Sequence, residues 1–263
     1  MLQVSNLTIC YNHANEPSLK DFSLNVSTNS LIVISGDSGS GKSTLAKALI
    51  NLLPKGTKKT GEITINNIGL SSNSPKDLFS TIGFLPQFPM DYNLNLLVYD
   101  EIAFPLENLG CTKEEITKKI DIILEKLHIQ YLKNKIITEL SSGELQKVSL
   151  ATAMVSEPKI IILDEPFARM DPKSELNLIE IIKELKKSSL IIILEHHLDY
   201  ILELADWVVI LDDGETVAQG NSQEIIEKLG QNKPEISQII IPPNRSNFSS
   251  FEKTLSELKK YID

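Results

Sequence analysis

The chain has 263 residues, of which 41% are hydrophobic and 23% charged, a composition typical of one large globular domain or one domain plus a small appendage. Its formal net charge of -9 provides no general basic surface, which argues against nucleic acid as the main partner. Cys10 and Cys111 are far apart and form no CxxC pattern. We therefore expect two reduced packing residues, as in cytosolic proteins, rather than a disulfide or a metal site.

Short apolar stretches in the first third of the chain predict strands at Leu2–Ile9, Phe22–Val26, Leu31–Ile34, Gly61–Ile68 and Ile82–Leu85. A glycine-rich turn over Ser35–Ser43 leads into a predicted helix over Thr44–Leu53, which Pro54 ends. The N-terminus lacks the pattern of a signal peptide, and no apolar run is long enough to cross a bilayer.

The middle of the chain changes to helical spacing. Thr112–Leu127 has apolar residues three and four apart, and Thr112 with Glu115 predicts a capping box. Ser141–Val155 predicts a second amphipathic helix. We therefore expect a helical subdomain over about residues 90–155, inserted in an α/β core.

Strands and helices alternate again after this block. The predicted strands are Ile160–Leu163, Leu190–Leu194 and Trp207–Leu211, and the predicted helices are about Ser174–Lys186 and Leu198–Ala205. This alternation predicts a largely parallel sheet. Ser249–Ile262 predicts a short amphipathic helix that either docks on the core or pairs with another subunit.

A glycine-rich segment carries the strongest local pattern, because residues 36–43 fit the P-loop pattern G-x-x-x-x-G-K-[ST] between a predicted strand and a predicted helix. The glycines let successive N–H groups point at phosphate oxygens, and the helix N-terminus adds its dipole. Lys42 adds a charge, and the Ser43 hydroxyl can coordinate Mg²⁺. The strand and helix context disfavours a chance glycine turn. The residues are Gly36, Asp37, Ser38, Gly39, Ser40, Gly41, Lys42 and Ser43, followed by Thr44.

Two acidic residues, Asp164 and Glu165, directly follow the apolar run Ile160–Leu163. At the end of a buried strand, Asp164 can hold the Mg²⁺ shell while Glu165 polarises the attacking water. The alternative is an acid that only caps the turn after a strand, an interpretation that the upstream phosphate loop makes less favoured.

The segment Leu140–Glu144 has two compatible interpretations. Ser141 as N-cap with Glu144 three residues later predicts a capping box. A capped helix N-terminus is also an anion site, so the segment can serve structure and ligand binding together.

The order of these segments resembles the motif series of ABC ATPases over residues 1–220. The resemblance implies an α/β fold with a P-loop NTPase (RecA-like) core of the ABC ATPase type that contains the inserted helical subdomain. Residues 221–263 are expected to form a short C-terminal helical extension. In that series Gln87 lies in the Q-loop, Asp171 in the D-loop, and His196 is the switch histidine. His197 is the neighbouring alternative, which we assign to the surface or to a helix start.

Residue roles follow from the same resemblance. The implied catalytic residues are Glu165, His196, Lys42 and Gln87, and the implied Mg²⁺ ligands are Ser43, Gln87 and Asp164. The implied ATP contacts are Tyr11 under the adenine, the phosphate loop from Gly36 to Thr44, the signature residues Ser141, Ser142, Gly143 and Glu144, and Asp171.

Two segments depart from the family's consensus sequence. The family pattern L-S-G-G-Q reads L-S-S-G-E here, so Ser142 brings a Cβ that resists positive φ and Glu144 brings a carboxylate that weakens anion binding. The D-loop reads Ala168–Asp171 in place of the usual S-G-L-D. The predicted fold does not depend on these positions. The ability of the signature segment to support full ATP hydrolysis does.

In the family, ATP lies between the phosphate loop of one subunit and the signature loop of another. Both half-sites are present in this chain, so we expect a head-to-tail dimer with itself or with a sister subunit. The apolar residues of Pro89–Leu97 either receive a coupling helix of a membrane subunit or pack inside the helical insertion.

A narrower resemblance is to the ATPases of energy-coupling-factor transporters, carried by Val98–Phe104, Glu107–Ile116, Leu194–Tyr200 and Lys233–Ser237. It implies two ATPases at the cytoplasmic face of the cell membrane. Their partners are a transmembrane coupling protein and a membrane protein that captures a vitamin or cobalt or nickel ions. The alternatives are the ATPase of a conventional ABC importer, or a soluble ABC ATPase in iron–sulfur assembly or DNA repair.

Overall fold

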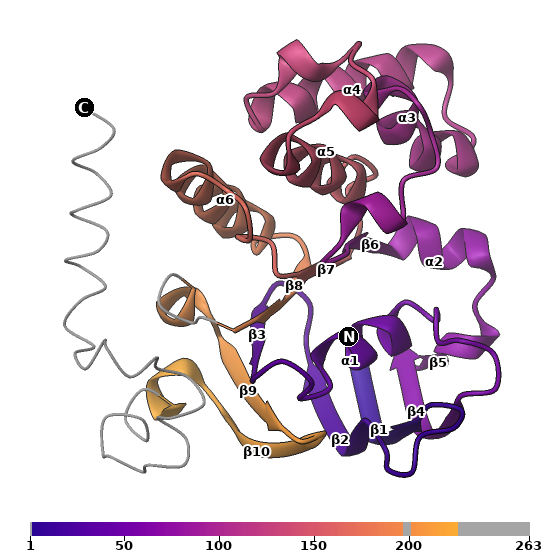
Figure 1. Cartoon of the computed structure of the whole chain (residues 1–263), viewed down its shortest axis with the longest axis vertical. Helices are drawn as coiled ribbons and strands as arrows, with labels where there is room; N and C mark the ends of the chain where they lie inside the picture. The colour runs from indigo at the N-terminus through magenta and orange to yellow at the C-terminus, as the bar shows by residue number, and fades with distance from the viewer. Residues whose placement is uncertain (1, 197–200, 226–263) are drawn as a thin grey trace. The chain divides into compact units, whose positions relative to one another are not determined.

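The computed structural model describes residues 2–196 and 201–225. The chain forms two compact units (Figure 1). Of the described residues, those up to Ser72 and those from Ile192 on belong to unit 1, and Asn73–Ile191 form unit 2. No helix in the described part of the chain is both long and apolar enough to span a membrane.

Unit 1 contains an antiparallel sheet with the strand order β2-β1-β4-β5. Its strands are β1 (Leu2–Cys10), β2 (Leu19–Val26), β4 (Lys58–Ile65) and β5 (Ile68–Gly69). The single strand predicted over Gly61–Ile68 is therefore wrong. Asn66 and Asn67 have φ of 52° and 64°, and two successive residues with positive φ form the tight turn that separates β4 from β5.

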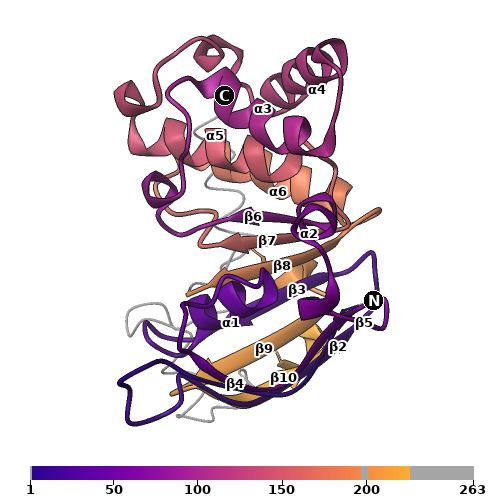
Figure 2. The same ribbon diagram turned by 90° about the vertical axis from the view of Figure 1, so that its right-hand side faces the viewer.

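The second group of strands in unit 1 leads to the phosphate loop. β3 (Leu31–Ser35) pairs in parallel with β9 (Trp207–Asp212), and β9 pairs antiparallel with β10 (Glu215–Gly220). β8 (Leu190–Glu195) lies next to β3 in the strand order and crosses the boundary between the two units. Figure 2 shows the helix α1 (Lys42–Leu49) beside β3 and β9.

The predicted helix over Thr44–Leu53 has the wrong ends. It begins two residues earlier at Lys42 and ends at Leu49. Asn51 has φ of 58°, a left-handed conformation that cannot continue an α-helix, so the helix stops before Pro54.

Unit 2 combines two parallel strands with helices. β6 (Ile82–Leu85) and β7 (Ile160–Asp164), both predicted as strands, pair in parallel, and β8 follows β7 in the strand order. The helices are α2 (Pro75–Thr81), α3 (Val98–Leu109), α4 (Lys113–Lys126), α5 (Ser142–Met154) and α6 (Pro172–Leu185). α3 packs against α4 and α5, and α5 packs against β6.

One-turn 3₁₀ helices occur in both units. Those of unit 1 lie at Leu70–Ser72 and Leu202–Leu204, and those of unit 2 at Pro89–Asp91, Gln130–Leu132 and Ile137–Glu139.

Both capping boxes read from the sequence are confirmed. Thr112 accepts from the amide of Glu115 at the start of α4, and Ser141 accepts from the amide of Glu144 at the start of α5. Sequence reasoning missed α2 and α3. A third capping box, Ser74 with Asp77, was the readable signal for α2, whereas Pro105 inside α3 obscured the helical pattern.

Two further predictions need correction. The predicted parallel pairing is observed for β3 with β9 and for β6 with β7. However, β10 pairs antiparallel with β9, and the sheet that contains β1 and β4 is entirely antiparallel. Of the helix predicted over Leu198–Ala205, the described part contains only the 3₁₀ turn Leu202–Leu204. Ser249–Ile262 lies outside the described residues.

Candidate functional site

The phosphate loop of unit 1 connects the fully buried strand β3 to α1. Gly36, Gly39 and Gly41 all have positive φ, the backbone pattern that turns successive N–H groups to one side. A Cβ on Gly36 would lie 2.1 Å from the carbonyl oxygen of Leu211 in β9, so this position admits only glycine. Packing against the neighbouring strand therefore holds the start of the loop in place.

The N-terminus of α1 fits a bound anion. Gly41 at its N-cap offers no side-chain hydrogen bond, and the first turn contains no acidic residue. In contrast, α2, α4, α5 and α6 each begin with a side chain that accepts from a backbone amide. The first N–H groups of α1 thus have no side-chain cap to compete with a phosphate.

Lys42 is 5% exposed and its ammonium lies inside the loop. Its Nζ donates to the carbonyl oxygens of Gly36 and Asp37, the latter at 2.9 Å, and lies 3.5 Å from Ser40 Oγ. Backbone dipoles therefore stabilise the buried charge where the loop can present it to a phosphate.

The structure brings His196, which follows β8, to the same loop. His196 Nδ1 lies 2.9 Å from the carbonyl oxygen of Gly36 and 3.3 Å from Lys42 Nζ. As an N–H donor, Nδ1 bonds to Gly36, and as an unprotonated acceptor it receives from Lys42, so the tautomer selects the partner. The neighbouring alternative, His197, lies outside the described residues.

Tyr11, expected to carry the adenine-stacking ring, follows β1 and is half-buried. Its hydroxyl donates to Thr44 Oγ1 over 3.2 Å. This bond joins the end of β1 to the first turn of α1, and it orients Tyr11 relative to the phosphate loop within unit 1.

The acidic pair lies in unit 2, at the end of β7. Asp164 is the last residue of this buried strand and is 4% exposed. Glu165 follows it with φ of 52°, a left-handed conformation that is uncommon for a residue with a side chain. Such a conformation persists only where the surrounding structure holds it, and such positions cluster at functional sites.

Gln87 is half-buried and follows β6, the neighbour of β7. The next residue, Phe88, is 51% exposed, and the guanidinium of Arg169 lies 5.4 Å from the centre of its ring. This cation–π contact joins the segment after β6 to the segment after β7. The sequence did not predict this contact, because Arg169 entered only as part of the segment Ala168–Asp171, which departs from the family's usual sequence.

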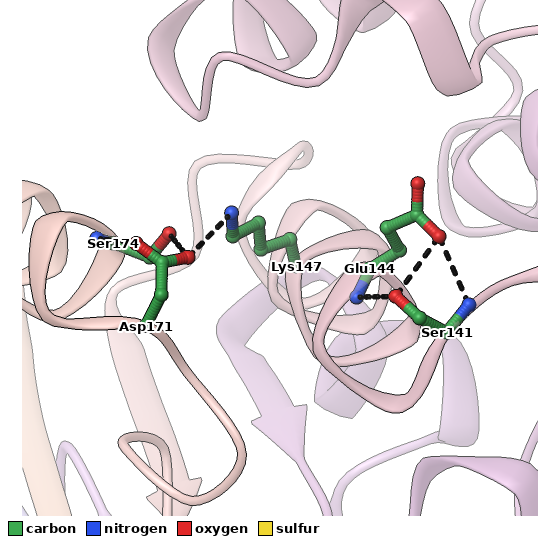
Figure 3. A network of polar contacts seen from close by, with 5 residues as sticks. All are labelled: Ser141, Glu144, Lys147, Asp171 and Ser174. Atoms are coloured by element: carbon green, nitrogen blue, oxygen red, sulfur yellow. Dashed lines mark hydrogen bonds and ion pairs between the residues drawn. The ribbon is translucent and has the colours of Figure 1, made fainter.

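The signature segment lies at the N-terminus of α5 (Figure 3). Ser141 N donates to Glu144 Oε2 over 2.9 Å, and Glu144 N donates back to Ser141 Oγ over 3.3 Å. The expectation that Ser142 resists positive φ does not apply, because Ser142 is the first helical residue of α5 and lies outside the residues with positive φ. The glycine matters one residue later: a Cβ on Gly143 would lie 2.8 Å from the carbonyl oxygen of Arg169.

The carboxylate of Glu144 is already engaged. One oxygen serves the capping box, and the other lies 3.6 Å from Lys135 Nζ. The hydrogen bond from the Ser141 amide, with smaller contributions from the Ser141 hydroxyl and Lys135, lowers the pKa of Glu144. Its negative charge therefore belongs to the cap of α5 and is partly compensated there.

Asp171, the D-loop residue, is the N-cap of α6. It accepts from Ser174 N over 3.0 Å, and its carboxylate lies 3.6 Å from Lys147 Nζ on α5 (Figure 3). The hydrogen bond from the Ser174 side chain is the main reason that the pKa of Asp171 is lowered. An ion pair thus connects the signature helix to the start of α6.

A phosphate loop after a buried strand, an acidic pair after a second one and the mixed sheets define an ABC ATPase fold, and the matching family model has the description "ABC transporter" over residues 19–168. The chain belongs to this family: it is an ATP-binding subunit of an ABC transporter and an ATPase.

Its relatives give the narrower similarity. A putative ABC transporter ATP-binding protein of Pyrococcus abyssi is 32% identical over 87% of this chain and 83% of its own length. The putative HMP/thiamine import ATP-binding protein YkoD of Bacillus subtilis is 34% identical over 91% of this chain. The chain spans only about half the length of YkoD and of several other relatives, with 46%, 54% and 47% of three of them covered.

Two solved structures add to this picture. The structure of cbiO1 from Clostridium perfringens, described as part of the ABC transporter complex cbiONQ, is 31% identical. It covers 90% of this chain and 97% of its own with a TM-score of 0.70. The dimeric ATP-binding cassette MJ0796, in a post-hydrolysis state with ADP and Pi, is 25% identical, with 84% and 99% of the two chains covered and a TM-score of 0.76.

We predict that Glu144→Gln removes part of the acid sensitivity of folding. The folded-state pKa of Glu144 is lowered from 4.5, so its charge stabilises the native state above about pH 4.5 and this contribution is lost as the pH falls through the lowered folded pKa. Gln retains the capping geometry but does not titrate. Urea unfolding at pH 7, 5, 4 and 3 should therefore show the wild type more stable by about 1 kcal/mol or less at neutral pH. The gap should close on acidification, and a gap independent of pH contradicts the assignment.

Proposed function

We propose that this chain powers an energy-coupling-factor importer for a vitamin or for cobalt or nickel ions. The observation that supports this most is the similarity to cbiO1, part of the complex cbiONQ, over 90% of this chain. The name of YkoD, an HMP/thiamine import ATP-binding protein, is consistent with import. The segments Val98–Phe104 and Leu194–Tyr200 resemble the same group in sequence.

The proposal assigns a role to each predicted residue of the ATP site. The phosphate loop, with Lys42, binds the phosphates, Tyr11 supports the adenine, and Gln87 and His196 contact the terminal phosphate. Glu165 accepts the proton of the water that attacks the γ-phosphorus, while the bond from this phosphorus to the oxygen of the departing ADP breaks. The uncapped N-terminus of α1 and the left-handed backbone at Glu165 support these assignments.

Mg²⁺ fits the donor set available here. When it accompanies a nucleotide, this ion takes most of its oxygen ligands from phosphates and water and needs only one or two protein ligands. Asp164, with its buried carboxylate, and the Ser43 hydroxyl are hard oxygen donors of this kind, and Gln87 offers an amide oxygen. Bound in this way, Mg²⁺ would neutralise charge that develops on the phosphates.

A head-to-tail pair of ATPases completes the proposal, with Ser141, Ser142, Gly143, Glu144 and Asp171 facing the nucleotide of the partner subunit. The capped N-terminus of α5 supports an anion contact, because its amides and dipole point out of the helix. The dimeric state of the similar cassette MJ0796 also supports pairing.

The membrane partners would dock on an exposed apolar segment of unit 2, at the cytoplasmic face of the membrane. This docking segment contains Phe88, Met90, Tyr92, Leu94 and Leu96, with exposed fractions of 51%, 54%, 39%, 70% and 64%. Several large apolar side chains that stay exposed along one short segment favour an interaction surface. We propose that a transmembrane coupling protein binds here and in turn holds the substrate-capture protein.

We predict that Lys42→Ala and Glu165→Gln each lower ATP turnover roughly 100-fold or more, because they remove the phosphate-binding charge and the general base. The steady-state release of phosphate by the purified protein measures this loss. Lys47→Ala, on the last turn of the same helix, and Glu157→Gln, another glutamate with positive φ, are the matched controls and should keep near-wild-type turnover. Full turnover by either test variant refutes the assigned roles.

The head-to-tail pairing predicts that turnover per subunit falls on dilution. Each half-site lacks donors that only a second subunit supplies, so a monomer cannot surround the terminal phosphate. Phosphate release measured over a dilution series should fall in step with the dimer fraction determined by light scattering. A specific rate that stays constant into the clearly monomeric range excludes the pairing.

We predict that Leu94→Glu with Leu96→Glu prevents co-purification with the membrane partners from native membranes. Two charges in the docking segment would have to be buried against the partner, whereas ATP binding by the isolated chain should stay unchanged. Ile122→Glu is the control, because Ile122 on α4 is also 55% exposed but lies outside the docking segment. Mass spectrometry of the bound proteins identifies the transporter type, and undiminished assembly of the double variant would rule this docking segment out.

A further inference from the structure

Gln146 is a buried polar residue that none of the assignments above uses. It lies on the second turn of α5, two residues after the signature segment, and is 1% exposed. Its Nε2 donates to the carbonyl oxygen of Glu165 over 3.2 Å and to that of Pro166 over 3.4 Å. The Gln146 side chain thus binds the backbone of the residue to which we assign the general base.

The backbone at Glu165 needs such support. With φ of 52°, Glu165 adopts a conformation that its own Cβ disfavours, so neighbouring groups must hold the peptide in place. Its carbonyl oxygen also accepts from Ala168 N over 3.2 Å. Because the carbonyl is fixed from two sides, the direction in which the Glu165 side chain leaves the backbone is fixed as well.

The hydrogen bonds of Gln146 are poorly explained by stability alone. Its Oε1 has no hydrogen-bond partner among the described residues, and a buried amide with one unsatisfied end is less favourable than an apolar side chain of the same size. A polar residue retained at such a position calls for another explanation, and the geometry at Glu165 provides one.

Neighbouring residues of α5 hold the rest of the same segment. Lys147 pairs with Asp171 at its far end, and Gly143 lies directly against the carbonyl of Arg169. The first two turns of α5 therefore contact the segment from Glu165 to Asp171 at its beginning, its middle and its end, and Gln146 makes the contact nearest to the proposed chemistry.

We propose that Gln146 is a positioning residue for ATP hydrolysis: by holding the carbonyl of Glu165 it aims the Glu165 carboxylate at the attacking water. This inference rests on the proposed role of Glu165 as general base. Gln146 itself touches neither the water nor the nucleotide and acts only through Glu165.

The test uses Gln146→Met, which keeps the length of the side chain and removes its donor. We expect kcat to fall roughly tenfold or more, because small misplacements of a catalytic group have effects of this size. KM for ATP and the affinity for ADP should stay near wild-type values. Ser149→Ala is the matched control: Ser149 lies one turn later on α5, is 7% exposed, and its hydroxyl has no hydrogen-bond partner within the described part of the chain. It should leave kcat unchanged.

A double-mutant cycle separates positioning from a structural effect. In the Glu165→Gln background, single-turnover rates should show no further loss on adding Gln146→Met, because the group to be aimed is no longer a base. An equal loss in both backgrounds, or a kcat for Gln146→Met within about twofold of wild type, overturns the inference. Gln146→Leu, which also lacks the donor, replaces the Met variant if that variant does not fold. Full turnover by Glu165→Gln alone would instead contradict the proposed role of Glu165.

Discussion

In the buried strands β3, β7 and β8 every residue except the last is apolar, and this constraint places the polar candidates for chemistry at or after the carboxyl ends of these strands. All residues of β3 and β7 are buried, and the single polar residue of each strand, Ser35 or Asp164, stands at its carboxyl end. The phosphate loop follows β3, the acidic pair closes β7, and His196 follows the buried strand β8. Ligands of open α/β sheets commonly bind outside the carboxyl ends of the strands.

Within each unit, backbone contacts hold the residues that we propose for ATP hydrolysis. In unit 1, the carbonyl of Gly36 lies within hydrogen-bond distance of both Lys42 and His196, so a single peptide group orients both side chains. In unit 2, the carbonyl of Glu165 accepts from Gln146. Main-chain atoms are well suited to this task, because their positions depend on the sheet and the helices rather than on a flexible side chain.

The unusual sequence of the signature segment has a local physical explanation. Glu144 completes a capping box with Ser141, and the nearby Lys135 partly compensates its charge. Ser142 adopts an ordinary helical conformation, so replacing a glycine there causes no backbone strain. Gly143, which packs against Arg169, is the position that tolerates no side chain. The departures from the family pattern thus preserve the geometry at the start of α5.

The sequence by itself determined those features that depend on neighbouring residues: the phosphate loop between a strand and a helix, the buried strands, and the capping boxes at Thr112 and Ser141. The antiparallel sheet of β1 and β4 was not predictable in this way, because pairing between strands far apart in the chain leaves no local pattern.

Only the tertiary structure decided the contacts that orient the site. His196 and Gly36 are 160 residues apart, Gln146 and Glu165 are 19 apart, and Arg169 reaches Phe88 from another segment. Such contacts depend on how strands and helices pack, and a single sequence carries no periodic signal for them. Motif spacing therefore predicted the candidate catalytic groups, while packing selected the residues that hold them.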